Sequence, residues 1–231
     1  MSEFAFDPDD KIVHGALRPK DAATLILVNR EGEPRVLMGQ RHSGLAFMAG
    51  KFVFPGGRVD PGDRRIAAVS ELRPEVFEKL SIGVAPSRAR GIALAAIRET
   101  FEEPGVLVGE RREKCPRTRS PAWARYFAHN VMPRLDALDF IARAITPPNR
   151  PRRFDARFFM ADANAIAHVV EDQENEELLK PCWLTLAEAR ALDVPSITRR
   201  VLAEVEFRLS SGPRPVPFFT FARGKASLSY L

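Results

Sequence analysis

The sequence has few of the residues that mark exported or disulfide-stapled proteins. Among 231 residues there are only two cysteines, Cys115 and Cys182, and neither belongs to a CxxC motif or to a Cys/His spacing that would hold zinc. A disulfide framework is therefore not expected, and the expected compartment is the reducing cytoplasm. The opening residues, MSEFAFDPDDK, are acidic where a secretory signal would be basic, which favours a protein that is not exported.

Long apolar runs, internal repeats and low-complexity tracts are also lacking. The longest apolar stretches, 25–28 and 92–97, are far shorter than the roughly 20 residues that a membrane-spanning helix needs, so we expect no membrane association. Hydrophobic residues make up 45% of the chain and charged residues 28%, which excludes a wholly disordered or fibrous protein. The length allows one large domain, and we predict a single domain over residues 1–231.

A large excess of one charge is missing as well. The chain has 35 Lys and Arg against 30 Asp and Glu, a formal net charge of +5. A dedicated nucleic-acid binder concentrates more charge in a clear patch. Residues 110–125 carry six basic and two acidic groups, and residues 142–157 carry five and one. These clusters favour a small anionic substrate over a nucleic acid.

The first half of the chain contains strand-like runs followed by one long helix. Runs at 22–28 and 35–40, separated by NREGEP, predict a hairpin, and a short strand at 51–54 ends in Pro-Gly-Gly. Residues 64–89 resemble a loop insertion that contains a short helix at 74–80. The apolar spacing of 91–103 predicts a helix that Pro104 and Gly105 terminate, followed by a strand at 106–109.

The second half is less regular. Apolar periodicity between Trp123 and Ile145 predicts two helices, and hence a mostly helical insertion at about 110–150. Runs at 154–160 and 165–170 are expected to pair as strands, and 178–184 is expected to be the final strand. Thr185 and Glu188 have capping-box spacing at the start of a helix, and a last helix is expected at 197–209. This alternation is an α+β or α/β pattern.

Three acidic residues end the central helix. Glu99, Glu102 and Glu103 are three and four residues apart, so on a helix they share one face. Such a cluster repels itself at a helix C-terminus, where the macrodipole also disfavours negative charge. A hard divalent cation with oxygen ligands, Mg²⁺ or Mn²⁺, would neutralise it. The alternative is a solvated acidic helix face.

The residues around this helix resemble the Nudix box, the signature of the Nudix hydrolase superfamily. Its pattern is Gly, five residues, Glu, seven residues, then Arg-Glu-apolar-x-Glu-Glu-x-Gly-apolar. The residues that match are Gly57, Arg98, Glu99, Glu102, Glu103, Gly105 and Val106. Asp63 replaces the first family Glu, 34 residues separate it from Arg98 where the family usually has seven, and Thr100 holds a usually aliphatic position. Loops tolerate such insertions at a cost that grows slowly with length.

The wider sequence is similar to the large-insert Nudix subgroup that includes the peroxisomal acyl-coenzyme A diphosphatases. The similarity covers about residues 20–210 and includes FVFPGGRVDPGD, AIRETFEEPGVLVG and CWLTLAEARAL. It implies the α/β Nudix fold, an α/β/α sandwich with a mixed central sheet and a helical insertion. A homodimer is also expected, since Nudix proteins are often dimers.

The resemblance implies hydrolysis of the diphosphate linkage of a nucleoside diphosphate derivative, with Mg²⁺ or Mn²⁺ as cofactor. Coenzyme A or acyl-coenzyme A is the substrate it indicates, and NADH- or ADP-ribose-type nucleotides and nucleotide-capped RNA are alternatives. A non-catalytic Nudix-like nucleotide-binding regulatory module is a different class. The intact glutamates of the box argue against that class.

The resemblance also implies roles for particular residues. Metal ligands would be Glu99, Glu102, Glu103 and the backbone near Gly57, and Arg98 would orient Glu99. The general base is either a glutamate of the box or an acid of the loop EDQENEE, where Glu174, Glu176 and Glu177 are the candidates. Arg41 and Lys51, beside the early strands, are candidates for substrate phosphate contacts, with a solvated surface position as the alternative.

Overall fold

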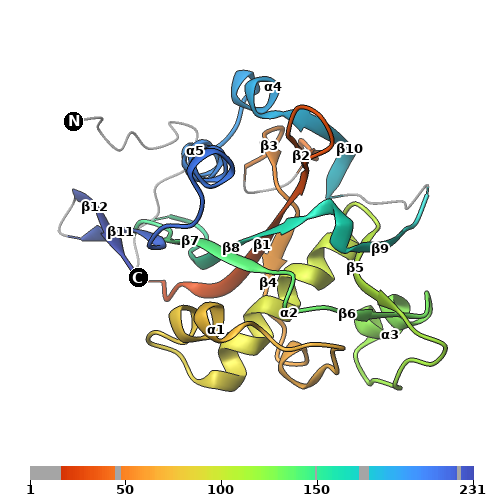
Figure 1. The fold of residues 1–231 in the computed structure, drawn as a ribbon. Helices are drawn as coiled ribbons and strands as arrows, with labels where there is room; N and C mark the ends of the chain where they lie inside the picture. Colours follow the sequence, from red (N-terminus) through yellow and green to blue (C-terminus); the bar gives the residue numbers. More distant parts are fainter. Residues whose placement is uncertain (1–16, 45–47, 149, 172–176, 223–224) are drawn as a thin grey trace.

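A mixed β-sheet between two layers of helices forms the centre of the chain (Figure 1). This computed structural model describes residues 17–44, 48–148, 150–171, 177–222 and 225–231. The helices α1 (Pro74–Leu80) and α2 (Pro86–Glu102) cover one face of the sheet, and α4 (Leu186–Ala191) and α5 (Ser196–Ser211) cover the other. The architecture is therefore the predicted α/β/α sandwich.

The central sheet runs from β10 at one edge to the hairpin β11–β12 at the other. Its strand order over the described residues is β10 (Leu178–Thr185), β2 (Arg35–Arg41), β1 (Lys20–Asn29), β8 (Phe154–Asp162), β7 (Asp139–Ile145), β11 (Pro217–Ala222) and β12 (Lys225–Tyr230). The short strands β3 (Phe52–Val53) and β4 (Gly56–Arg58) pair with β2 and β1. The pairs β1–β8 and β7–β11 are parallel, so the sheet is mixed.

A second, smaller sheet lies beside α2. It consists of β6 (Val131–Pro133), β5 (Val106–Arg111) and β9 (Ile166–Val169), with the helix α3 (Pro121–Phe127) next to it. Two 3₁₀ turns, η1 (Asp63–Arg65) and η2 (Ala163–Ala165), complete the described elements. No helix in the described ranges combines the length and apolar character that crossing a membrane requires.

The alternation of β1 explains why both faces of the sheet are covered. Leu25 and Leu27 are fully buried in the core beneath α1 and α2, and Ile26 and Val28 are fully buried in the core beneath α4 and α5. Successive side chains of a strand point to opposite faces, so an apolar run such as LILV needs a hydrophobic layer on each side. The run therefore predicts a central strand.

Several predicted elements are confirmed by the structure. The hairpin of β1 and β2 is present, α1 has the predicted bounds 74–80, and the capping box joins Thr185 and Glu188 at the start of α4. The helix α2 begins at Pro86 rather than at residue 91. Its first turn is polar, so the apolar periodicity begins one turn late. The predicted insertion 64–89 therefore ends at 85, and its first residue packs onto the helix at Gly91, where an added Cβ would lie 2.7 Å from Cγ of Arg64.

The prediction of two helices between Trp123 and Ile145 is wrong. Only α3 is helical there, and β6 and β7 are strands, so the insertion at about 110–150 is not mostly helical. In β7 Phe140 is buried in one core, and Ile141 and Ala142 are buried in the other. A strand buried on both faces loses the period-two signal that would identify it.

Two further strand predictions are corrected. The runs at 154–160 and 165–170 do not pair with each other, because β8 pairs with β1 and β7 while β9 pairs with β5. The run at 178–184 is not the final strand, because β11 and β12 follow it. It forms the edge strand β10 instead, paired with β2.

Candidate active site

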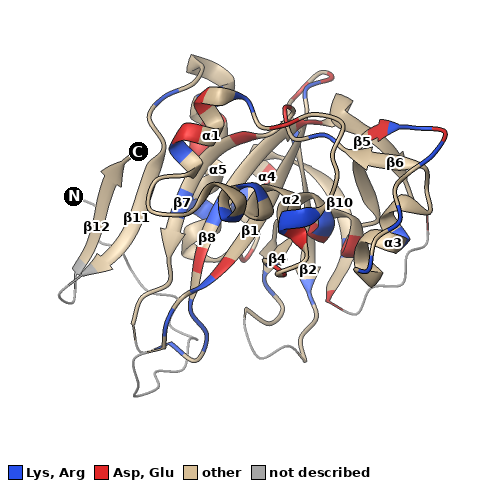
Figure 2. Cartoon of the chain, turned by 90° about the horizontal axis from the view of Figure 1, so that it is seen from below, with Lys and Arg blue, Asp and Glu red and all other residues tan. Residues whose placement is uncertain are grey.

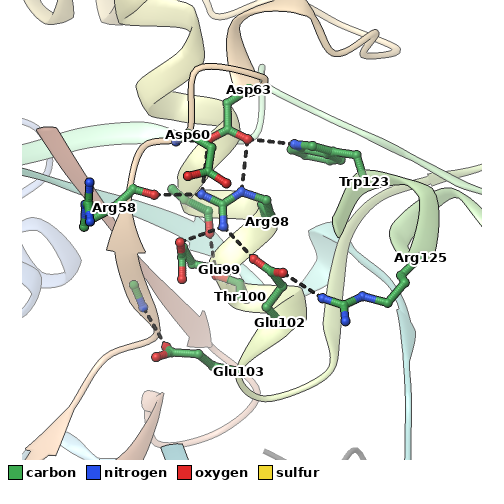
Figure 3. A network of polar contacts seen from close by, with 12 residues as sticks. Arg58, Asp60, Asp63, Arg98, Glu99, Thr100, Glu102, Glu103, Trp123 and Arg125 are labelled. Carbon is green, nitrogen blue, oxygen red and sulfur yellow. Dashed lines mark hydrogen bonds and ion pairs between the residues drawn. The ribbon is translucent and has the colours of Figure 1, made fainter. Parts of the chain in front are cut away.

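The last turns of α2 are organised around the guanidinium of Arg98, which is 4% exposed (Figure 3). Its Nε donates to Oδ1 of Asp63 at 3.0 Å and its Nη2 to Oδ2 of the same carboxylate at 3.1 Å. Nη2 also donates to the backbone carbonyl of Arg58 in β4 at 2.7 Å. One side chain therefore ties the helix to β4 and to the turn that follows it.

Asp63 is fully buried and has further partners of its own. It accepts hydrogen bonds from Nε1 of Trp123 at 2.7 Å and from the backbone N–H of Asp60 at 2.8 Å. A buried carboxylate costs free energy unless it is paired and hydrogen-bonded, and here both conditions are met. The pairing with Arg98 forms although 34 residues separate the two in the sequence. The inserted segment thus leaves this contact in place.

The remaining nitrogen of Arg98 holds two of the three acids of the helix. Nη1 donates to Oε1 of Glu99 at 2.7 Å and to Oε2 of Glu102 at 2.5 Å. The other oxygen of Glu102 accepts from Nη2 of Arg125 in α3 at 2.8 Å. Glu102 is therefore held between two arginines, and its carboxylate is directed toward α3 (Figure 3).

Glu103 lies on the other side, against β4. Its Oε2 accepts the backbone N–H of Gly56 at 2.8 Å, and the side chain is 5% exposed. The next residue, Gly57, faces Glu99, since an added Cβ would stand 2.5 Å from Oε2 of that glutamate. The two glycines of FPGG therefore let the strand approach both carboxylates closely.

The end of α2 and the departure at Thr100 also have local causes. Gly105 has a φ of +75°, and its N–H donates to the carbonyl of Phe101 at 3.1 Å. This left-handed residue ends the helix directly after the acids, as the sequence predicts. The hydroxyl of Thr100 donates to the carbonyl of Ala96 at 2.8 Å. A hydroxyl at a usually aliphatic, buried position is thereby satisfied within the helix.

Burial dominates the electrostatics of the two carboxylates beside β4. It raises the pKa of Glu99 to about 7, with Arg98 acting in the opposite direction and the charge of Glu102 adding to the rise. Burial also raises the pKa of Glu103 to about 8, opposed by the N–H of Gly56 and reinforced by the charge of Glu99. Both groups therefore resist carrying a negative charge at neutral pH unless a cation lies nearby.

The chemistry of these residues fits a divalent cation. Glu103 is buried and Glu99 is partly buried, the two carboxylates repel each other, and Gly57 offers a position without a side chain beside Glu99. Glu102 is bonded to two arginines, which sets it apart from this pair. Within the described residues, no group of three or more His, Cys, Asp or Glu side chains is arranged to hold a metal ion. The carboxylates of Glu99 and Glu103 are therefore the side chains that best fit a divalent cation.

A cavity of about 490 Å³ opens beside this pair. Of the residues predicted from the sequence, Gly57, Glu99, Arg41 and Glu177 line it. Arg41 also lies 4.0 Å from Oε1 of Glu103, measured from its Nη1. The charge of Glu177 contributes to the raised pKa of Glu103, and its side chain is exposed.

Other predicted residues are not among those that line the cavity. The ammonium of Lys51 is bonded to Asp193 at 3.0 Å. Arg98 and Glu102 belong to the network behind the cavity. The loop acids Glu174 and Glu176 lie outside the described residues.

Sequence reasoning missed several residues of the cavity wall. They come from β4, α5 and β11, and include Arg58, Arg200 and Phe219. Arg150 and Arg152 of the β7–β8 loop also line the cavity, and they belong to the basic cluster at 142–157 from which the sequence predicts an anionic substrate. Arg200 and Phe219 carry no local motif, because they reach the site only through the packing of α5 and β11.

The chain is similar in sequence to known proteins over part of its length. No family model matches the chain. Over 68 residues the chain is 41% identical to the "Uncharacterized Nudix hydrolase NudL" of Salmonella heidelberg (strain SL476), and equally to that of Salmonella agona (strain SL483). These matches cover 29% of this chain and 35% of each relative. The aligned part is thus about a third of the length of the curated relatives.

A solved structure extends the similarity over most of the chain. The crystal structure of a NUDIX hydrolase from Alicyclobacillus acidocaldarius matches with a TM-score of 0.61 and 25% identity, covering 85% of this chain and 98% of that one. The chain therefore has the Nudix fold. Both similarities support its assignment to the Nudix hydrolase superfamily, whose members generally use divalent metals.

Removing the carboxylate of Asp63 should destabilise the folded protein. Asp63→Ala leaves the guanidinium of Arg98 buried without its main partner, and we expect a loss of about 3–5 kcal/mol in the free energy of unfolding. Urea titration followed by tryptophan fluorescence measures it. Asp60→Ala removes an exposed side chain of the same turn and should change stability by less than about 0.5 kcal/mol. Equal effects of the two substitutions would contradict the role given to Asp63.

The metal-free protein should lose stability as the pH rises. The carboxyls of Glu99 and Glu103 have pKa values of about 7 and 8 in the folded chain, above the reference value of 4.5. The folded state therefore binds more protons, and their stabilising contribution is lost as the pH rises through 7 and 8. In EDTA we expect a lower free energy of unfolding at about pH 8.5 than at about pH 6.

The substitution Glu103→Gln should remove part of this pH dependence, because it deletes one of the two titrating groups. Glu171→Gln, at an exposed position, serves as the control and should leave the dependence unchanged. Urea titrations at both pH values give the comparison. If the free energy of unfolding changes equally between the two pH values in wild type and in Glu103→Gln, burial of this carboxyl does not control the pH dependence.

Proposed function

We propose that the protein is a divalent-metal-dependent hydrolase that cleaves the diphosphate linkage of a nucleoside diphosphate derivative. The observation that carries the proposal is the pair Glu99 and Glu103, set against Gly57 and Gly56, with Glu99 in the wall of a cavity that also contains arginines. Cleavage of a diphosphate needs neutralisation of its oxygens and a positioned water. The Nudix hydrolase homologues support a hydrolase that acts on diphosphate bonds.

Coenzyme A or acyl-coenzyme A is the substrate we propose first. It rests on the resemblance to the peroxisomal acyl-coenzyme A diphosphatases over about residues 20–210. The size of the cavity supports a substrate larger than a simple phosphate ester, because pockets of about 300–1,000 Å³ typically hold drug-sized ligands. The apolar part of the wall supports a substrate with an organic body beyond its phosphates.

The residues of the site would have separate roles in binding the metal ion and the substrate. Glu99 and Glu103 would hold Mg²⁺ or Mn²⁺, with Glu102 contributing directly or through water and the backbone near Gly57 adding an oxygen. The bound ion would supply Lewis acidity and lower the pKa of a water molecule. Arg98 fixes the rotamer of Glu99 through the hydrogen bond at 2.7 Å. Arg41, whose guanidinium lines the cavity, would bind a non-reacting phosphate oxygen.

Two groups of residues are candidates for the general base: the acids of the loop EDQENEE and the glutamates of α2. Glu177 lines the cavity and is exposed, so its carboxylate can reach a bound molecule. The alternative is a glutamate of α2, and here Glu102 is engaged by Arg98 and Arg125. Glu177 is therefore the base we favour among the described residues. If Glu177→Gln keeps its turnover number within about tenfold of wild type, the general base is a glutamate of α2 and not Glu177.

The proposal is tested with a panel of nucleotides that contain a diphosphate. Coenzyme A, acyl-coenzyme A, NADH, ADP-ribose and a nucleotide-capped RNA are incubated with Mg²⁺ or Mn²⁺, and phosphorylated products are quantified. We expect release from at least one compound, and a loss of at least about 100-fold in kcat in Glu99→Gln and Glu103→Gln, because an oxygen ligand becomes a neutral amide. EDTA should abolish the activity of the wild type.

The control for the panel is Glu171→Gln, at an exposed position, which should keep full activity. If no compound is hydrolysed and no metal shifts the melting temperature, the enzyme proposal is wrong, and a non-catalytic nucleotide-binding module takes its place. If capped RNA is cleaved faster than every free nucleotide, the substrate proposal is wrong while the chemistry stands.

A further inference from the structure

The cavity extends across the central sheet, well beyond the acids of α2. One row of paired residues crosses its floor: Arg58, Ala22, Ala156, Ala144 and Phe219, on β4, β1, β8, β7 and β11. All five line the cavity. With about 4.8 Å between neighbouring strands, the row from β4 to β11 spans about 19 Å. The cavity can therefore hold a molecule much longer than the diphosphate that would be cleaved.

The three central positions of this row carry only methyl groups. Ala144, Ala156 and Phe219 pack against the core beneath α5, so the row lies on the α5 face of the sheet. Small side chains here leave room above the sheet, and Phe219 closes the row at the far end. The guanidinium of Arg200, on α5, stands over the ring of Phe219 with its Cζ 5.6 Å from the ring centroid. This far end thus offers an apolar floor beneath a cation.

The two ends of the cavity differ in charge, because the end near α2 carries Arg41 and Arg58 together with glutamates, whereas the described wall of the far end carries arginines alone. The glutamates in its described wall, Glu99 and Glu177, both lie at the end near α2, where each influences the carboxyl of Glu103. The far end is walled by Arg150 and Arg152 of the β7–β8 loop and by Arg200, and no acidic residue of the described chain joins them in the wall. The β7–β8 loop is visible as blue segments in Figure 2.

Arg150 and Arg152 both line the cavity but differ in exposure. Arg150 is 6% exposed yet lines the cavity, so it is built into the wall rather than lying loose on the surface. Arg152 is exposed, and its side chain has no ion-pair partner within the described residues. The first turn of α5, with Ser196 and Thr198, faces the same space and adds the positive end of a helix dipole.

We propose that this far end, the arginine subsite, binds a second anionic group on the non-reacting half of the substrate. The subsite is made by Arg150, Arg152 and Arg200 above Phe219. The ligand chemistry is a nucleoside that bears a phosphate ester of its own, apart from the diphosphate: the organic body covers the alanine floor and the ester pairs with the arginines. This inference rests on the proposed function, because it takes the α2 end as the place of cleavage.

The test uses binding, which is independent of hydrolysis. Isothermal titration in EDTA compares AMP with adenosine 2′,5′-bisphosphate and adenosine 3′,5′-bisphosphate, probes that differ by one phosphate ester. Wild type should bind at least one bisphosphate about tenfold more tightly than AMP, because charge-assisted hydrogen bonds to arginine are strong. The preference should fall at least about threefold in Arg152→Ala and disappear in the double variant Arg152→Ala/Arg200→Ala.

Arg199→Ala is the matched control, since Arg199 is the exposed neighbour of Arg200 on the same helix and does not line the cavity. It should keep the wild-type preference. Equal affinity of wild type for AMP and both bisphosphates, or an unchanged preference in the double variant, would overturn the subsite. A preference that depends on the arginines in a protein without hydrolase activity would uphold the subsite and refute the proposed function.

A second readout applies if the enzyme is active. The ratio of kcat/KM for NADPH over NADH, and for coenzyme A over its dephospho form, should exceed one for at least one pair in wild type. In the double variant that ratio should fall through KM, with kcat unchanged, because the arginines lie away from the bond that is cleaved. A fall in kcat alone would assign the arginines to the reaction centre and overturn the proposal.

Discussion

The ion pair between Arg98 and Asp63 is the contact on which the site depends. It is buried on both sides, and it joins the acidic end of α2 to the turn after β4. Buried ion pairs contribute little net stability compared with a well-packed apolar pair, but breaking one is costly. Its value here is therefore positional, because the same guanidinium also fixes Glu99 and Glu102.

This arrangement explains how the chain tolerates a long insertion beside its most demanding residues. The inserted segment begins directly after Asp63, where Arg64 packs on α2 at Gly91, and it continues into α2 itself at Pro86, before the acids begin. The insertion is thus held at its start by contact with the helix and at its end by running into the helix. The loop can grow outward without moving the carboxylates, since loop length costs free energy only slowly.

The two carboxylates beside β4 are unfavourable for the stability of the metal-free protein. Glu103 is buried and Glu99 is partly buried, and the loss of solvent contact raises the pKa of each. An apolar pair at these positions would stabilise the metal-free fold, and the divalent cation that we propose would account for the two acids. Under the proposed function, the arginines of the wall would balance the charge of an anionic substrate in the same cavity.

Local sequence signals predicted the parts of the site that lie within one stretch of chain. The spacing of Glu99, Glu102 and Glu103, the glycines of FPGG and the helix end at Gly105 could all be read along the sequence. What could not be predicted is the separation of Glu102 from the other two, because it depends on Arg125 of α3, a helix placed by tertiary packing.

The same distinction holds for the fold. The hairpin of β1 and β2 and the helix α1 are defined by local pattern, whereas β7 is a strand because it is buried on both faces, which the sequence of one segment does not reveal. The far wall of the cavity combines that strand with α5 and β11. Its residues are brought together by the order of strands in the sheet, which no single segment of the sequence reveals.

The central claim is that Glu99 and Glu103 together bind a divalent cation beside Gly57. The most direct measurement is an anomalous difference map from a crystal of the protein soaked in Mn²⁺. We expect a peak within coordinating distance of the carboxylates of both glutamates, and its absence from a Glu103→Gln crystal treated in the same way. A peak placed only between Glu102 and solvent, or no peak on α2 at all, would contradict the claim.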